Sequence, residues 1–133
     1  MVPTDNDWAN LLDQVESGGT FTSQTDYGWI GANAGGLLRS ASTYVGADLG
    51  DGSWVFSQEN QASDLYGFTA LPSGMRYPTG SQFYGRGQAT YLMTSSAESS
   101  ELTPARSFQA WSQQSGRSRA SRSQAVAVRC RKL

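Results

Sequence analysis

The clearest hydrophobic pattern lies near the start of the chain. Four large apolar residues recur at i, i+3, i+4 and i+7, the spacing of one stripe along an α-helix: Trp8, Leu11, Leu12 and Val15. Thr4 precedes them as a candidate N-cap, and acidic residues at positions 5 and 7 suit the positive end of a helix. Gly18-Gly19 predicts the helix end. Burial of each large side chain contributes about 1.5–3 kcal/mol, so this helix is expected to pack on a core.

Beyond this helix the pattern changes to short segments. Gly, Ala and Ser dominate residues 21–52, with a candidate second helix over Ala32–Ser40. Pro72-Ser73-Gly74 and Pro78-Thr79-Gly80 predict turns. Segments of alternating polarity predict strands: Ala89–Thr94, Ser107–Ser112 and Gln124–Lys132. The segment Ser112–Ser123 is instead biased toward Ser, Arg and Gln.

Helices followed by short strands predict an α+β domain. The chain has 133 residues, the size of one domain, so residues 1–133 are interpreted as a single unit. In the last predicted strand, Cys130 shares a face with two valines and is expected to point inward. The predicted core consists of large apolar residues: Trp8, Leu12, Phe68, Leu71, Phe83, Val126 and Val128.

Composition excludes several kinds of chemistry. The chain has no histidine and one cysteine, which removes the commonest general base, the usual zinc sites, Cys-His nucleophile pairs and any internal disulfide. No run approaches the roughly eighteen apolar residues of a membrane span, and no basic-then-apolar signal segment opens the chain. We therefore expect no enzyme activity, no cofactor, no metal site and no membrane insertion.

The near-zero net charge of −1 hides an asymmetry along the chain. Residues 1–105 carry 3 basic and 11 acidic side chains, 3 − 11 = −8, whereas residues 106–133 carry 7 basic and no acidic ones, +7. One interpretation is that the two parts compensate each other within the fold. The other is that a positive face meets an acidic partner.

Several segments form an ordered set of motifs. The chain opens with Val2-Pro3-Thr4-Asp5 and Trp8, continues with Ala34-Gly35-Gly36-Leu37-Leu38, and then reads Gly-Phe-Thr-Ala-Leu-Pro-Ser-Gly-Met-Arg over residues 67–76. Ser95-Ser96-Ala97-Glu98 and the closing Val128-Arg129-Cys130 follow. In this order the segments resemble the Fibrobacter succinogenes major paralogous domain, whose most distinctive stretch is Gly-Phe-x-Ala-Leu-Pro-x-Gly-x-Arg. The resemblance spans almost the whole chain.

The resemblance implies a fold, and the sequence departs from the family pattern in two places. That family is related to the formylglycine-generating-enzyme branch of the C-type lectin fold, which implies one or two helices on a small twisted antiparallel sheet with long loops. Members usually have a strand before the Val-Pro-Thr-Asp element, so we expect a trimmed N-terminus or a pared-down fold here. The Gly-Phe-Ser that usually precedes the closing motif is Ala125-Val126-Ala127. Formylglycine-generating enzymes need paired or metal-binding thiols, so a lone inert Cys130 argues against that activity.

Domains of this kind also serve as variable proteins of diversity-generating retroelements, found in phages and archaeal viruses among other sources. There, adenine-directed mutagenesis rewrites an Asn-rich stretch near the C-terminus. This chain has no Asn after Asn60, and its C-terminal third is rich in Ser, Arg and Ala and contains Gly116; all four residue types are products of mutated Asn codons. The resemblance therefore implies a variable region over about residues 91–124. The alternative is the ordinary polar surface of a cell-surface paralogue.

Ligand contacts are expected within this variable region. The candidates are polar, small or interface-prone side chains: Thr94, Ser99, Leu102, Thr103, Arg106, Trp111, Gln113, Arg117, Arg119, Ser121 and Arg122.

Two other sites are weaker. Asp48-Leu49-Gly50-Asp51-Gly52 could be a calcium loop, but its ligand density favours an acidic turn. The arginines with Trp111 could contact nucleic acid, but a pI of about 5.2 and the lack of a known motif favour a protein interface. We expect a ligand-binding protein of a virion or cell surface that recognises a protein or other macromolecule and no nucleic acid. A fixed-specificity adhesion or structural module is the alternative, and a degenerate enzyme is a third reading.

Overall fold

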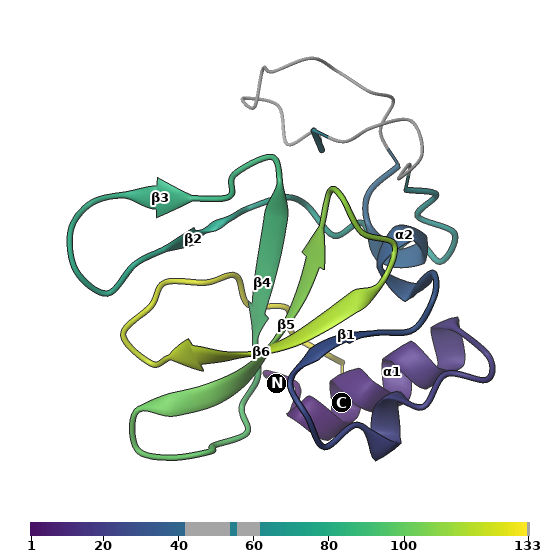
Figure 1. Cartoon of the computed structure of the whole chain (residues 1–133), viewed down its shortest axis with the longest axis horizontal. Coiled ribbons are helices and arrows are strands. Elements are labelled where there is room, and N and C mark those ends of the chain that lie inside the picture. The colour runs from purple at the N-terminus through teal and green to yellow at the C-terminus, as the bar shows by residue number, and fades with distance from the viewer. Residues whose placement is uncertain (42–53, 56–61, 133) are drawn as a thin grey trace.

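The computed structural model describes residues 1–41, 54–55 and 62–132 (Figure 1). This part of the chain is α+β, as the sequence predicts, with two α-helices and a small antiparallel sheet. The helical elements are α1 (Asp5–Val15), the 3₁₀ turn η1 (Phe21–Ser23) and α2 (Ala34–Leu38). The strands are β1 (Gly28–Ile30), β2 (Met75–Arg76), β3 (Phe83–Tyr84), β4 (Ala89–Met93), β5 (Leu102–Gln109) and β6 (Ser115–Ser121).

Helix α1 begins at the cap that the sequence predicts. The Thr4 hydroxyl accepts from the backbone N–H of Asp7, and the Asp7 carboxylate accepts from the backbone N–H of Thr4, so a complete capping box closes the first turn. Trp8, Leu12 and Val15 are buried along one stripe. The helix therefore packs as its apolar spacing requires.

The main sheet has the strand order β1-β6-β5-β4, and all its neighbours are antiparallel. β1 comes from the first quarter of the chain and forms the edge strand next to β6. β2 and β3 form a separate two-stranded hairpin beside the main sheet (Figure 1).

The two faces of the main sheet carry different side chains. Leu92, Arg106 and Phe108 lie on the face that α1 covers, because Leu92 and Phe108 join the core cluster with Trp8 and Arg106 binds Asp5. We call this the helix face. The opposite face carries the alternate residues of each strand, which are mostly small.

Helix α2 packs tightly on the turn between β5 and β6. The backbone N–H groups of Gly35 and Gly36 donate to the carbonyl of Gln113 at 2.7 and 3.2 Å. A Cβ at Gly35 would lie 2.3 Å from the carbonyl oxygen of Gln114, so only glycine allows this approach. The predicted second helix therefore exists, with tighter bounds than expected.

The buried arginine Arg39 follows α2 directly. Its Nη1 donates to the Gln109 carbonyl at 2.7 Å, and its guanidinium lies 5.2 Å from the Trp54 ring centroid. Burial lowers the pKa of Arg39 to about 10. This side chain joins α2 to the end of β5.

The predicted C-terminal strand is wrong. Within the described residues, its β-pairing is limited to isolated bridges, at Arg76↔Ala125 and Leu92↔Ala127. Cys130 is exposed and Val128 exposes 56% of its surface, so neither faces the core. Ala127, which the alternation placed on the opposite face from the valines, is the residue that packs against the core.

The predicted core is partly confirmed. Trp8 and Leu12 are buried, and Phe68 packs against the core from a partly buried position. Leu71 and Phe83 are 53% and 74% exposed, so their assignment to the core is wrong, and Val126 is half-buried. The loop around Leu71 and the two-stranded hairpin that holds Phe83 lie outside the main packing layer.

Candidate ligand-binding surface

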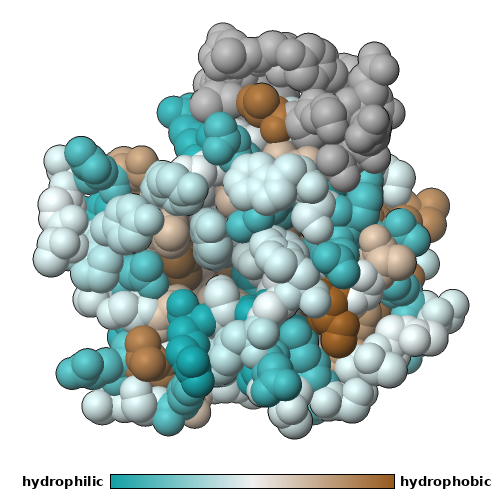
Figure 2. All heavy atoms as spheres, viewed as in Figure 1, coloured by the Kyte–Doolittle hydropathy of each residue, from teal (hydrophilic) through white to brown (hydrophobic). Residues whose placement is uncertain are grey.

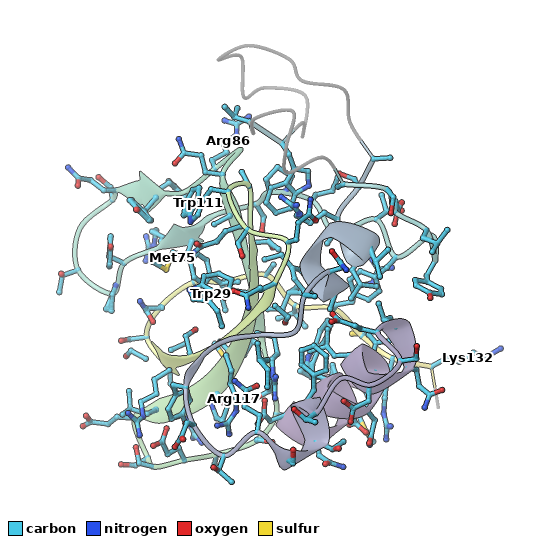
Figure 3. The ribbon with its side chains drawn as sticks, turned by 45° about the vertical axis from the view of Figure 1, so that its right-hand side comes forward. Trp29, Met75, Arg86, Trp111, Arg117 and Lys132 are labelled. Carbon is cyan, nitrogen blue, oxygen red and sulfur yellow. The ribbon has the colours of Figure 1, made fainter. Side chains whose placement is uncertain are left out.

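The β5–β6 ladder sorts the predicted ligand contacts into two groups. Its register pairs Leu102 with Ser121 at one end of the sheet. Trp111 follows the other end of β5, at Gln109. Seven residue steps of about 3.3 Å separate Leu102 from Gln109, so the two ends lie about 23 Å apart. Figure 3 shows Trp111 in its upper part, and Arg117, which pairs with Arg106 within the ladder, low and near α1.

Seven of the eleven predicted residues gather at the end of the sheet that holds Leu102 and Ser121. We call this the loop end, because the loop over residues 94–101 closes it. These seven residues are Thr94, Ser99, Leu102, Thr103, Arg119, Ser121 and Arg122. Figure 2 shows mainly hydrophilic side chains over this lower-left part of the molecule.

A pocket of about 330 Å³ opens at the loop end. It is lined by Thr94, Thr103 and Arg122 together with Met93, Ser95 and Ser96. The two threonine side chains are only 4% and 3% exposed, and their hydroxyls are used inside the fold. The Thr94 hydroxyl donates to the Pro104 carbonyl at 2.7 Å, and the Thr103 hydroxyl donates to the Ser96 carbonyl. They therefore shape the wall of the pocket rather than offer free groups to a ligand.

Arg119 and Glu98 form an ion pair at the loop end, and Arg119 is the more exposed of the two side chains. Its guanidinium meets the Glu98 carboxylate at 2.8 Å and remains 54% exposed. The Tyr27 hydroxyl also donates to Glu98, at 2.6 Å, and the Tyr27 ring stacks with Arg119 at 4.2 Å. Hydrogen bonds from Arg119 and then from Tyr27 lower the pKa of Glu98. The cluster fixes Arg119 on one side and leaves its other edge open to solvent.

The remaining polar residues at the loop end are held by the backbone and by each other. The Ser99 hydroxyl accepts from the Leu102 N–H at 3.0 Å, and the Ser121 and Ser123 hydroxyls lie 2.7 Å apart. Arg122 is exposed and forms no ion pair within the described residues. Its forked donors therefore face solvent beside the pocket.

Two predicted ligand contacts, Arg106 and Arg117, instead hold the fold. The Asp5 carboxylate receives Arg106 Nε at 2.7 Å on one oxygen and Arg117 Nη2 at 2.9 Å on the other. Their side chains are 1% and 13% exposed. Burial lowers the pKa of Arg106, opposed by its bond with Asp5. Both arginines are thus engaged with Asp5 of α1, and their role as ligand contacts remains a prediction.

Trp111 and Gln113 belong to the far end of the sheet. Trp111 is 53% exposed, so a ligand can reach it. It lies at the end of the sheet opposite the loop end, so a ligand bound there would contact a different surface. Gln113 is half-buried, and its side-chain oxygen accepts from Arg39 Nη2 at 3.4 Å while its carbonyl holds α2. Gln113 is therefore part of the packing between α2 and the sheet, and its role as a ligand contact remains a prediction.

The opposite face of the sheet contains a row that the sequence did not single out. The register places Trp29, Gly116, Ser107 and Tyr91 side by side across the four strands. The Trp29 ring is 42% exposed, and a Cβ at Gly116 would lie 3.0 Å from it. No local motif marks this row, because it forms only when four separate strands align.

The charge asymmetry of the chain is resolved inside the fold. All four ion pairs among the described residues join an arginine after residue 105 to an acid before it: Arg106–Asp5, Arg117–Asp5, Arg119–Glu98 and Arg131–Asp7. The sequence left compensation and a free positive face open. Compensation accounts for four of the seven basic residues, and Arg122, Arg129 and Lys132 remain outside ion pairs in the described part of the chain.

Within the described residues, no three of Asp, Glu and Cys are grouped so as to hold a metal ion. The candidate calcium loop at Asp48–Gly52 lies outside the described residues. The described helices include none that is long and apolar enough to cross a membrane.

Tyr27 and Glu98 are site residues that sequence reasoning missed. Glu98 lies in the Ser95–Glu98 motif, but its role depends on Arg119, which is 21 positions away. Tyr27 lies in a Gly-rich stretch without any distinguishing pattern. Only the pairing of β1 with β6 brings it to the loop end.

The fold and the loop end define a small α+β domain with a polar, arginine-bearing surface at one end of its sheet. The sequence model of the Fibrobacter succinogenes major domain matches residues 1–132, and the chain belongs to that family. No curated protein and no solved structure matches the chain significantly.

Proposed function

We propose that this protein binds a macromolecular ligand through the loop end, on a C-type lectin scaffold whose surface a retroelement diversifies. The ligand is a protein or other macromolecule on a cell surface, and the protein itself is displayed on a virion or a cell. The domain works by recognition, without catalysis, cofactor or metal. Nucleic acid is not its ligand.

One observation carries this proposal. Within residues 91–124, the side chains that hold the fold are separate from those that face solvent at the loop end. Arg106 and Arg117 are fixed by Asp5, and Phe108 is fully buried in the core. The Ser121 hydroxyl contacts Ser123, and Arg122 forms no ion pair within the described residues. The β5–β6 ladder holds the backbone of Ser121, and the Arg122 N–H donates to the Glu101 carbonyl. Substitutions at these two positions therefore leave the core contacts intact.

The chemistry of the loop end suits a protein interface. Arg119 and Arg122 offer donors for carboxylates and carbonyls, and arginine is enriched at interface hot spots. Ser99, Ser121 and Ser123 are short, so their contribution to binding comes at low side-chain entropy cost. The surface is preformed by strand pairing, so binding loses little free energy to loop ordering.

Deep sequencing of this gene across a natural population tests the proposal. We expect substitutions at adenine positions to concentrate at loop-end residues such as Ser99, Ser121 and Arg122. Arg106, Phe108 and Arg117 lie in the same segment and serve as the internal control, because they should stay constant. Variation scattered along the chain, or equal in the two sets, would contradict diversification and leave a domain of fixed specificity.

A fixed-specificity adhesion module is the second candidate. The observation that favours it is the internal compensation of charge, since four arginines after residue 105 already pair with acids of the same chain. A surface with few free charges fits a constant ligand such as a glycan. Binding to one glycan by many natural variants would support this candidate over the first.

A further inference from the structure

A second pocket lies between α1 and the C-terminal segment, and its lining residue Pro3 accepts a hydrogen bond from the N–H of Ser95 at the loop end. Its volume is about 430 Å³, within the range of small-molecule sites. Trp8 and Leu11 of α1, Phe68, and the C-terminal residues Arg129, Cys130 and Arg131 line it. Figure 1 shows the C-terminus beside α1. None of the predicted ligand contacts takes part in this pocket.

The walls of the pocket are aromatic and flat. The Trp8 and Phe68 rings meet edge to face, with centroids 5.7 Å apart at 71°. The Arg129 guanidinium lies 4.5 Å from the Phe68 ring centroid, in cation–π contact. These planar surfaces fit a planar, apolar ligand body better than a branched or highly hydrated one.

The pocket contains one cation outside ion pairs. Asp7 and Asn10 also line it, and Arg131 binds the Asp7 carboxylate at 2.7 Å. Arg129 forms no ion pair with any described acid. Among the described residues, the Arg129 guanidinium is therefore the charge in this pocket that a ligand would match.

We propose that this pocket binds a small aromatic carboxylate. The aromatic body lies against the Leu11 and Phe68 side chains, and the carboxylate pairs with the forked donors of Arg129. This inference is independent of the proposed function, because α1 and the C-terminal segment form the site without the loop end.

Cys130 provides a direct measurement. It is the only thiol of the chain, it is exposed, and it lines the pocket. Naphthylacetate is the probe, and we expect it to slow alkylation of Cys130 by neutral iodoacetamide at least about threefold at saturation. The concentration for half-maximal protection gives the Kd. The neutral amide of the same probe should bind about tenfold more weakly, which corresponds to about 1.4 kcal/mol for one charge-assisted contact.

Two variants decide whether the pocket recognises charge. Arg129→Gln should raise the Kd of naphthylacetate about tenfold, while Arg122→Gln, an exposed arginine outside this pocket, should leave it unchanged. Both variants should keep the melting temperature of the parent protein. Absence of protection in the parent protein would overturn the proposal. Equal protection by acid and amide, or an unchanged Kd in Arg129→Gln, would also overturn it and leave only an apolar crevice.

Discussion

Asp5 and Arg106 are joined by a 2.7 Å hydrogen bond across 101 positions of sequence. The contact ties the first turn of α1 to the centre of β5, and the arginine side chain is 1% exposed. Its second donor, Nη1, reaches the side-chain oxygen of Gln24 at 3.1 Å. The neighbouring Arg117 shares the same carboxylate, so a single acid anchors two strands to one helix.

Replacing the shared acid tests this anchor. Asp5→Asn keeps the size of the side chain but leaves the buried guanidinium of Arg106 without a counter-charge. Loss of one partner of a buried pair costs about 3–5 kcal/mol, so we expect a decrease of that order in the free energy of unfolding by urea. Asp26→Asn is the control, because Asp26 is exposed and outside the ion pairs of the described residues, and it should change stability by less than about 0.5 kcal/mol. Equal effects of the two variants would contradict the anchor.

Arg117 and Arg119 both stack on Tyr27, but they should differ in how much each contributes to stability. Arg117→Ala removes the ion pair with Asp5 and a 2.9 Å bond to the Thr25 carbonyl, so we expect a loss of about 2 kcal/mol or more. Arg119→Ala removes a pair that is largely exposed, and we expect a loss below about 1 kcal/mol. Thermal and urea unfolding of the two single variants measure the difference. A larger loss in Arg119→Ala would reverse the assignment of fold-holding and surface arginine.

Stability should depend on pH mainly in the acid range. The backbone N–H and the hydroxyl of Thr4 lower the pKa of Asp7, and Arg119 and Tyr27 lower that of Glu98. A carboxyl with a lowered pKa in the folded state contributes stability above its unfolded pKa of about 4, and this contribution is lost as the pH falls through the folded value. The chain has no histidine, so we expect little change between about pH 5.5 and 7.5.

Urea titrations between pH 7 and pH 2 measure this dependence. Asp7→Asn and Glu98→Gln should each show a shallower acid decline than the parent protein, because one proton-linked contribution has been removed. Asp26→Asn should follow the parent curve. A steep change near pH 6 would be inconsistent with a chain that has no histidine.

Replacement of Gly35 should destabilise the protein more than replacement of Gly67. A Cβ would lie 2.3 Å from the Gln114 carbonyl oxygen and 2.9 Å from that of Gln113, and neither backbone atom can move freely. We expect Gly35→Ala to cost about 3 kcal/mol and to speed amide exchange in α2. Gly67 has a positive φ of 64° but open space around it, so Gly67→Ala should cost about 1 kcal/mol and leave α2 protected. Retained protection of α2 in Gly35→Ala would refute the close approach.

The sequence predicts the elements whose pattern is local. Helix α1 follows from its apolar stripe and Thr4, and the predicted strand at 89–94 corresponds to β4. The sequence did not predict β6, because its inward position on the helix face beside Arg106 holds Arg117 rather than an apolar residue. A guanidinium neutralised by a distant acid can take the place of an apolar side chain, but its acid is 112 positions away in the case of Arg117.

The same limit applies to the candidate site. The range of residues that reach the loop end could be predicted, because it coincides with the segment after β4. Which arginines are free could not, since that depends on the partners Asp5, Asp7 and Glu98. The pocket beside Cys130 was equally hidden, because its walls come from α1, from Phe68 and from the C-terminal segment.

The two ends of the described chain are hydrogen-bonded to each other. The Met1 amino group donates to the Arg131 carbonyl at 3.2 Å, and the Arg131 N–H donates to the Met1 carbonyl at 2.9 Å. A domain whose ends meet can be spliced into a surface loop of a host protein without spreading that loop. The domain would then be held on two adjacent tethers, with the loop end close to them because the Ser95 N–H donates to the Pro3 carbonyl.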